Sequence, residues 1–406
     1  MILLWFCCGV GVWICRCQVR SRLIQALCFR KYNDVVLLYG KCHLMMERTK
    51  ERFFMNTKKM LAVWGVLLGA IGTVLAFFGN PGNMAFCIAC FVRDMAGAAR
   101  FHQAAIVQYM RPEIAGLVIG AFVISLVSKE FRSTGGSSPM IRFLLGIITM
   151  IGALMFLGCP LRMVLRMAGG DLNAYVALVG FILGAATGSF FLKKGFSLGR
   201  AYDTQKVSGC ILPGILALLF VLSIATGIFT ASTEGPGSMH APVMLSLAGG
   251  LVFGAIAQKA RTCFAGGIRD VILMKNFDLL TVIGALFVTM LVYNLVNGKF
   301  VLSFAGQPVA HTEHLWNMLG MYAVGFAAVL AGGCPLRQLI LAGQGSGDSA
   351  VYVAGMFVGA AVCHNFGLAS SGNGTTGAGR IACAVCILLL FVIGFTCKRE
   401  KRGNGR

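Results

Sequence analysis

Long apolar runs, separated by short polar segments, follow one another from residue 61 to residue 397. A helix rises 1.5 Å per residue, so about 17 to 25 mainly apolar residues cross the hydrocarbon core of a bilayer. The pattern predicts about ten such helices, at residues 61–79, 114–128, 141–158, 172–192, 208–230, 242–258, 279–297, 316–333, 349–369 and 381–397. We therefore expect an all-α polytopic membrane protein.

Four shorter helices are predicted between these spans, at residues 85–100, 160–169, 263–275 and 335–343. Helices of half the usual length cannot cross the hydrocarbon core. Non-helical backbone at that depth is tolerated only inside protein or beside a water-filled cavity. We expect these four segments to re-enter the membrane and to be shielded by the surrounding helices.

An internal repeat organises the chain. The five residues Gly158-Cys159-Pro160-Leu161-Arg162 recur identically 175 residues later as Gly333-Cys334-Pro335-Leu336-Arg337. The segment from Cys87 to Asp94 aligns in the same way with the segment from Cys263 to Asp270. Such agreement at a fixed spacing indicates a tandem duplication.

The charges of the loops predict the orientation. Lys and Arg are enriched in cytoplasmic loops of membrane proteins. With the N-terminus inside, fourteen cations fall in predicted cytoplasmic segments, whereas the outer loops 231–241, 298–315 and 370–380 carry only Lys299 and Arg380. The cytoplasmic cations are Lys129, Arg132, Arg142, Lys193, Lys194, Arg200, Lys206, Lys259, Arg261, Lys398, Arg399, Lys401, Arg402 and Arg406. Both termini are therefore expected in the cytoplasm.

The central span 208–230 lies between the two copies and makes the second copy run upside down, as in the inverted repeats of many transporters. The expected parts are a basic, Cys-rich extension at 1–54, a first repeat at 55–207, and a connecting span with its outer loop at 208–241. A second, inverted repeat follows at 242–370, and a final span with a basic tail at 371–406. The extension has no partner in the repeat, and we expect translation of the native protein to start at Met55.

Composition agrees with this fold class. Hydrophobic residues make up 57% of the 406 residues and charged residues only 12%, which leaves too little polar surface for a soluble globule. The formal net charge of +21 would suggest nucleic acid binding in a soluble protein. Here the cations concentrate in short loops, so nucleic acid is excluded as a partner.

The repeated Cys-Pro-Leu-Arg segments carry the candidate chemistry. Proline fits the first turn of a helix, which places Cys159 and Cys334 at the N-caps of two short helices. Unsatisfied N–H groups and the helix dipole favour an anion there, and Arg162 and Arg337 follow one turn inside. A thiol is a weak S–H donor and a polarizable acceptor, so it can hold a soft anion loosely. Conduction requires such weak binding.

Further candidates come from the second pair of aligned segments. Cys87 and Cys263 are predicted to join the substrate site, together with Arg93 and Arg269. Either arginine could instead form a structural pair with the aspartate that follows it, Asp94 or Asp270, because buried charges are usually paired.

Other polar and sulfur-containing positions are given structural roles. Asp171 and Asp348 are expected to cap the spans that follow them. Packing is the expected role of Cys210, Cys363, Cys383, Cys386 and Cys397. Cys87 and Cys90 have redox-motif spacing, but the counterpart of Cys90 is Gly266, which disfavours a duplicated dithiol. The sequence shows no nucleotide-binding glycine pattern and no histidine pair spaced as metal ligands, so we expect no cofactor and no metal.

Several of these segments resemble a known transporter family. Gly158-Cys159, Ala331-Gly332-Gly333-Cys334 and the stretch from Gln258 to Asp270 are similar to the three cysteine motifs of the YeeE/YedE family of membrane transporters. Four segments resemble, more narrowly, the branch of that family that is associated with bacterial selenium metabolism. They are residues 80–91, 111–113, 158–174 and 193–200. The family implies an hourglass-shaped inner-membrane protein that passes a thiosulfate-like anion along central cysteines, here Cys159, Cys263 and Cys334. The branch implies a selenium-containing species instead, and this chain adds Cys87 and a Pro-Leu-Arg after two of the cysteines.

We therefore expect a transporter, not an enzyme, in the inner membrane of a bacterium. Its substrate is a small selenium or sulfur anion, with the selenium species favoured, and a cytosolic selenium or sulfur acceptor protein is a candidate partner. An alternative is a membrane-embedded sulfur or selenium transferase in which Cys159 or Cys334 forms a persulfide-like adduct. A membrane scaffold that recruits partners is a third reading. Oligomeric state, coupling ion and direction stay open.

Overall fold

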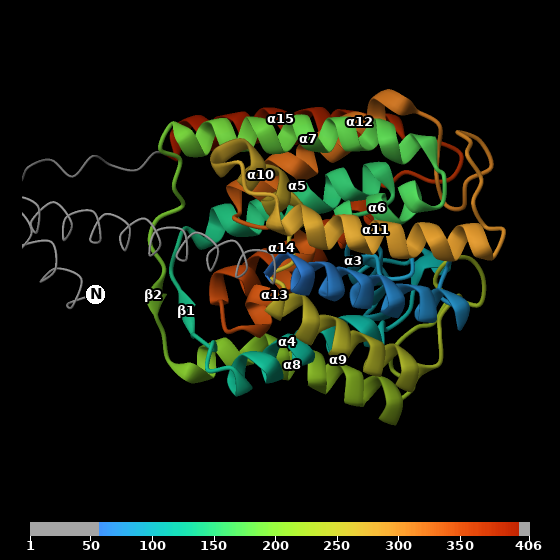
Figure 1. Cartoon of the computed structure of the whole chain (residues 1–406), viewed down its shortest axis with the longest axis horizontal. Helices are drawn as coiled ribbons and strands as arrows, with labels where there is room; N and C mark the ends of the chain where they lie inside the picture. Colours follow the sequence, from blue (N-terminus) through green and yellow to red (C-terminus); the bar gives the residue numbers. More distant parts are fainter. Residues whose placement is uncertain (1–56, 398–406) are drawn as a thin grey trace, which may run out of the picture. The chain divides into compact units, whose positions relative to one another are not determined.

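The computed structural model describes residues 57–397, which are almost entirely helical (Figure 1). Nine helices in this part of the chain are long and apolar enough to cross a membrane, the first of them at Thr57–Phe77. The elements that follow are α3 (Ile88–Ala98), η2 (Ala105–Val107), α4 (Pro112–Val127), β1 (Thr134–Gly135), α5 (Pro139–Phe156), α6 (Pro160–Ala168), α7 (Leu172–Lys193), β2 (Tyr202–Asp203), α8 (Lys206–Ala225), α9 (Val243–Lys259), α10 (Phe264–Met274), α11 (Asp278–Val296), α12 (His314–Leu330), α13 (Pro335–Gly343), α14 (Gly347–Asn365) and α15 (Gly377–Thr396). An all-α polytopic membrane protein is confirmed.

The count of spans differs by one from the expected ten. α14 lies where the span 349–369 was expected, but it is not among the nine apolar helices. It contains Asp348 in its first turn and His364 and Asn365 at its end, which lower its apolar character. The extension 1–54, the start at Met55 and the basic tail from Lys398 lie outside the described residues.

The four short helices form where they were expected. α3, α6, α10 and α13 have 11, 9, 11 and 9 residues, so none is long enough to cross a bilayer. α6 and α13 each begin with a proline, Pro160 or Pro335, directly after an extended cysteine. Proline suits this position because it has no N–H to lose and a fixed φ.

Helix packing follows the duplication of the sequence. α7 packs along α12, and the equivalent helices of the other copy, α14 and α5, pack together in the same way. Likewise α4 packs along α9, while α11 packs on the helix Thr57–Phe77, with Gly65 and Gly69 of that helix against α11. α5 and α12, which are equivalent to each other, are also in contact. Each of these helix pairs thus combines one helix from each copy, and the four short helices pack among them.

Glycine permits close approach between these helices, as the crossing of α5 and α12 shows. A Cβ added to Gly152 on α5 would lie 2.6 Å from the carbonyl oxygen of Gly320 on α12, and a Cβ on Gly320 would lie 2.8 Å from the carbonyl oxygen of Gly152. Both distances are too short for a real side chain. Small residues at such crossings let membrane helices pack backbone to backbone.

The two aspartates expected to cap spans behave differently. Asp171 is the N-cap of α7 and accepts a hydrogen bond from the N–H of Asn173 at 2.9 Å, as predicted. The prediction for Asp348 is wrong, because the N-cap of α14 is Ser346. Asp348 instead accepts hydrogen bonds from the N–H of Gly136 and Ser137 at 2.9 and 3.2 Å. A long-range contact that sequence spacing does not reveal has replaced the local one.

Candidate functional site

Four cysteines occupy the N-caps of the four short helices. Cys87, Cys159, Cys263 and Cys334 precede α3, α6, α10 and α13, and each has an extended backbone. All four are free thiols buried in the core, with exposures of 0, 1, 5 and 1% respectively. The duplication therefore places the same group at the same kind of helix end four times.

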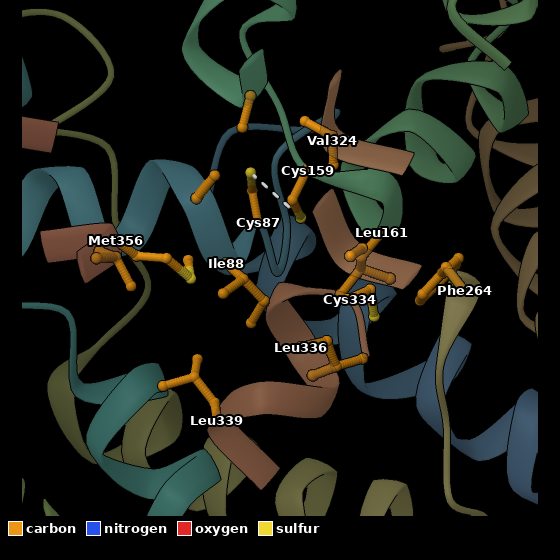
Figure 2. Close-up of a cluster of buried hydrophobic side chains, with 14 of the residues drawn as sticks. Cys87, Ile88, Cys159, Leu161, Phe264, Val324, Cys334, Leu336, Leu339 and Met356 are labelled. Atoms are coloured by element: carbon orange, nitrogen blue, oxygen red, sulfur yellow. Dashed lines mark hydrogen bonds between the residues drawn. The ribbon is translucent and has the colours of Figure 1, made fainter. Parts of the chain in front are cut away.

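The first copy brings two of these thiols together (Figure 2). The sulfur atoms of Cys87 and Cys159 lie 3.9 Å apart, within the range of an S–H hydrogen bond. The sulfur of Cys87 also accepts a hydrogen bond from the N–H of Cys90 at 3.4 Å and so caps α3. The side chain of Cys159 makes no such bond to α6, so its sulfur is not committed to capping its own helix.

The second copy forms a similar pair. The sulfur of Cys263 accepts hydrogen bonds from the N–H of Gly266 at 3.1 Å and from the N–H of Cys334 at 3.5 Å. A sulfur that receives two N–H groups lies in surroundings that favour negative charge. We refer to Cys87 with Cys159 as the first thiol pair and to Cys263 with Cys334 as the second thiol pair.

Apolar side chains from the same four helices line the space around the pairs. Ile88, Leu161, Phe264 and Leu336 are the first or second residues after the four cysteines, and all belong to the buried core. Figure 2 shows Leu161 and Leu336 beside Cys334, with Ile88 near Cys87. The thiols therefore lie among apolar side chains that the same four helices contribute.

Arg162 is fully buried beside the first thiol pair. Its guanidinium group donates to the carbonyl oxygens of Leu157, Asn83 and Val309, and to the side-chain oxygen of Asn83 at 3.0 Å. It also lies 3.4 Å from the sulfur of Cys90. None of the ion pairs among residues 57–397 involves Arg162, so its charge is hydrogen-bonded but has no carboxylate partner.

Arg337 is the equivalent residue beside the second thiol pair, and it is held far more loosely. Within the described part of the chain its one hydrogen bond goes to the side-chain oxygen of Gln258 at 3.3 Å. It too takes part in none of the ion pairs found there. Each copy thus contributes one cation without a carboxylate, one turn after a thiol.

Arg93 and Arg269 form the structural pairs that were one of the two predicted alternatives. Arg93 contacts Asp94 at 2.8 Å, and Arg111 contacts the other oxygen of the same carboxylate at 2.7 Å, all three groups being buried. Arg269 contacts Asp270 at 2.8 Å and is partly exposed. A role of either arginine at the substrate site stays a prediction.

The sequence alone did not predict that Asn83 and Cys90 contact Arg162; Cys90 was considered only for its redox-motif spacing with Cys87. Asn83 supplies two acceptors to Arg162, and Cys90 lies within 3.9 Å of the carbonyl oxygen of Leu157. Only their place in the segment 80–91 that resembles the selenium-associated branch could have marked them. Of the cysteines assigned to packing, Cys363, Cys383 and Cys386 are buried. Among residues 57–397 no group of three or more His, Cys, Asp or Glu side chains is arranged to hold a metal ion.

A comparison with protein families adds one finding. The model of a family described as sulphur transport matches residues 259–382. This stretch contains the second thiol pair and Arg337, and it runs from the end of α9 into α15. No curated protein matches the chain. With the nine candidate spans, the match supports a multi-pass membrane transporter for sulfur compounds, which implies a lipid bilayer around it and a small anion as substrate.

Proposed function

We propose that the chain moves a small selenium- or sulfur-containing anion across the bacterial inner membrane, inward, with the four N-cap thiols as the weak binding groups of the route. A selenium species is favoured, and a thiosulfate-like anion is the second candidate. The observation that carries this proposal is the pairing of buried thiols at the N-caps of helices too short to cross, each pair beside an arginine that has no carboxylate partner in the described chain.

The charge of the ligand follows from the arginines. A buried cation without a counter-ion is costly and stabilises an anion that comes close. The helix N-termini act in the same direction, because their free N–H groups and dipoles favour negative charge. A cationic or neutral substrate would gain nothing from Arg162, Arg337 or the four helix ends.

The softness of the ligand follows from the thiols. Sulfur is a weak hydrogen-bond partner but a polarizable one, and the surrounding side chains are apolar. A hard, strongly hydrated anion such as sulfate would lose its water without full compensation. Thiosulfate and reduced selenium anions carry a large, diffuse terminal atom, so weak thiol contacts suffice to hold them and still allow release.

The order of the route follows from the predicted topology. The first thiol pair lies near the end of α5, which is expected at the outer face, and the second near the end of α12, which is expected at the cytoplasmic face. An inward-moving anion would meet Cys87 and Cys159 first, and Cys263 and Cys334 second. No covalent step is needed, because each thiol exchanges one hydrogen bond for another.

Uptake by reconstituted vesicles tests the proposal. Vesicles containing the full chain should take up labelled thiosulfate or selenide, and not sulfate. Cys159→Ser and Cys334→Ser should each lower the rate about tenfold or more, because a hydroxyl is harder and binds water more strongly. Cys383→Ser, at a buried cysteine of α15, is the matched control and should transport normally. Failure of the wild-type chain to take up any of these anions would contradict the proposal.

The same vesicles distinguish transport from the transferase alternative. In a transferase, a thiolate of Cys159 or Cys334 would attack the outer sulfur of thiosulfate, form a persulfide and release sulfite. Mass spectrometry of the protein after turnover would then show an added sulfur on that cysteine. Uptake without such an adduct supports transport, whereas a persulfide that forms together with one equivalent of sulfite, and passes its outer sulfur to an added thiol acceptor, supports the transferase.

A further inference from the structure

The two copies differ at the position two residues before the Pro-flanking cysteine. In the first copy this residue is Leu157, which is buried and has a positive φ of 62°. In the second copy it is Gly332, with a φ of 87°, and a Cβ added there would meet no atom within 4 Å. A left-handed backbone favours glycine, so leucine at the equivalent position is an energetic cost that the first copy bears.

The end of α5, where Leu157 lies, is closed by hydrogen bonds from other elements. Four successive carbonyl oxygens accept hydrogen bonds there. The carbonyl of Leu154 accepts from the N–H of Ser370 at 3.2 Å, and that of Met155 from the ring of His311 at 2.8 Å. The carbonyl of Phe156 accepts from Arg166 at 2.8 Å, and that of Leu157 from Arg162. Two outer-loop segments and two buried arginines therefore cover the approach to the first thiol pair.

The equivalent end of α12 is much less covered. Within the described part of the chain, only one of the four carbonyl oxygens of the segment 329–332 accepts hydrogen bonds from side chains. It is that of Ala331, which accepts from Arg142 at 3.2 Å and from Gln338 at 3.0 Å. A surface pocket of about 160 Å³ opens against this segment and reaches Gly332, two residues before Cys334. The same pocket is lined by Arg142, Arg269 and the loop 196–199.

This pocket has the character of an anion site. Two guanidinium groups line it, whereas the carboxylates that they contact, Asp348 and Asp270, do not. The loop 196–199 lies between Lys194 and Arg200, so the surroundings are basic as well. Clefts lined by one sign of charge concentrate ligands of the opposite sign and raise their rates of association.

We propose that the pocket lined by Arg142, Arg269, Gly332 and the loop 196–199 is an anion vestibule, through which the second thiol pair communicates with the face of the protein that carries the basic loops. Leu157 and Arg162 close the equivalent approach to the first thiol pair. This inference rests on the proposed function, since it takes the transported anion as the ligand. It assigns Arg142 and Arg269 to the inner end of the route, with Gly332 in the wall that lies nearest to Cys334 in sequence.

Thiol-modifying reagents of opposite charge test the vestibule without requiring transport. Inside-out vesicles containing the full chain are treated with the anionic sulfonatoethyl or the cationic trimethylammonioethyl methanethiosulfonate, and modification of each cysteine is followed by mass spectrometry. The anionic reagent should modify Cys263 or Cys334 faster than the cationic one, and thiosulfate should slow it. Arg269→Gln should lower the anionic rate about tenfold and raise the cationic rate, because the same positive charge attracts one reagent and repels the other.

Matched variants separate charge from fold. Arg269→Lys should retain most of the preference for the anionic reagent, and Lys206→Gln, on the same basic face outside the pocket, should retain all of it. Gly332→Leu gives the second copy the residue of the first, and it should slow both reagents at Cys334 without changing Cys159. Leu157→Gly should make Cys159 more reactive in right-side-out vesicles.

Equal rates for the two reagents, or no modification by either, would overturn the vestibule. If Gly332→Leu does not fold, as judged by gel filtration and thermal unfolding, the Arg269 variants still test whether the modification rate depends on charge. Charge-dependent modification without any anion uptake would support the vestibule and contradict the proposed function. Anion uptake without charge-dependent modification would support the proposed function and contradict the vestibule.

Discussion

At the scale of single residues, identical side chains in the two copies make different hydrogen bonds. Arg162 and Arg337 stand in identical five-residue segments, yet the first donates to three backbone carbonyls and the second makes one bond to Gln258. The difference comes from neighbours far away in sequence. Arg162 donates to both oxygens of Asn83 and to the carbonyl of Val309. Within the described residues, Arg337 bonds only to the side-chain oxygen of Gln258, the counterpart of Asn83. The buried Arg162 joins the short helix α6 to two other segments, whereas Arg337 stays free to move toward a ligand.

This difference predicts unequal costs of removal. Arg162→Gln should destabilise the protein by about 3 kcal/mol or more, because hydrogen bonds to charged groups contribute roughly 1.5–3 kcal/mol each and buried carbonyls would lose their donor. Arg337→Gln should change stability much less and mainly weaken anion binding. Thermal unfolding in detergent, with the two variants side by side, measures the difference. Equal shifts in melting temperature would contradict it.

At the scale of elements, the sequence predicted well whatever depends on local chemistry. The four short helices were placed to within a few residues, because Cys-Pro and the lengths of the apolar runs determine where such helices begin and end. Sequence could not predict what depends on contacts between distant segments. The binding of Asp348 to the segment 136–137 and the bonds of Ser370 and His311 to the end of α5 join residues more than 150 positions apart. No periodicity or motif carries that information.

Two loops each contain a histidine that makes the same kind of bond to a backbone carbonyl. His102 bonds through its Nε2 to the carbonyl of Arg93 at 3.0 Å, and His311 bonds in the same way to the carbonyl of Met155 at 2.8 Å. In both loops the Nδ1 faces a backbone N–H two residues later, so it must be the acceptor and Nε2 must carry the proton. Burial lowers the pKa of His102 and of His311 below the ordinary value.

These loops predict loss of stability in acid. A histidine whose pKa is lowered in the folded state binds protons more readily when unfolded, so its contribution to stability is complete above the unfolded pKa of about 6.5 and declines as pH falls below it. The melting temperature in detergent should therefore drop between pH 7.5 and pH 5. The double variant His102→Gln, His311→Gln should start lower and fall less steeply. A wild-type curve that is flat over this range would refute the assignment.

At the scale of the whole chain, the duplication and the packing imply the same architecture. Equivalent helices make equivalent contacts, α7 with α12 and α14 with α5, and the two copies also meet where α5 contacts α12. Two copies joined by a single span, α8, should insert in opposite directions. Only then do the two thiol pairs lie one behind the other along a path across the membrane. The inverted arrangement is thus the premise on which a transport route depends.

Loops that are equivalent by the duplication test this premise directly. Protease sites inserted at Gly195, after α7, and at Gly372, after α14, fall in exposed segments where an added Cβ meets no atom within 4 Å. The site at Gly195 should be cleaved only in inside-out vesicles, because basic loops favour the cytoplasm, and the site at Gly372 only in right-side-out vesicles. Detergent, which exposes both faces, serves as the control for intrinsic cleavage. Cleavage of both sites from one face would mean that the copies are parallel. The thiol pairs would then lie at the same depth, and a path from one to the other could not cross the bilayer.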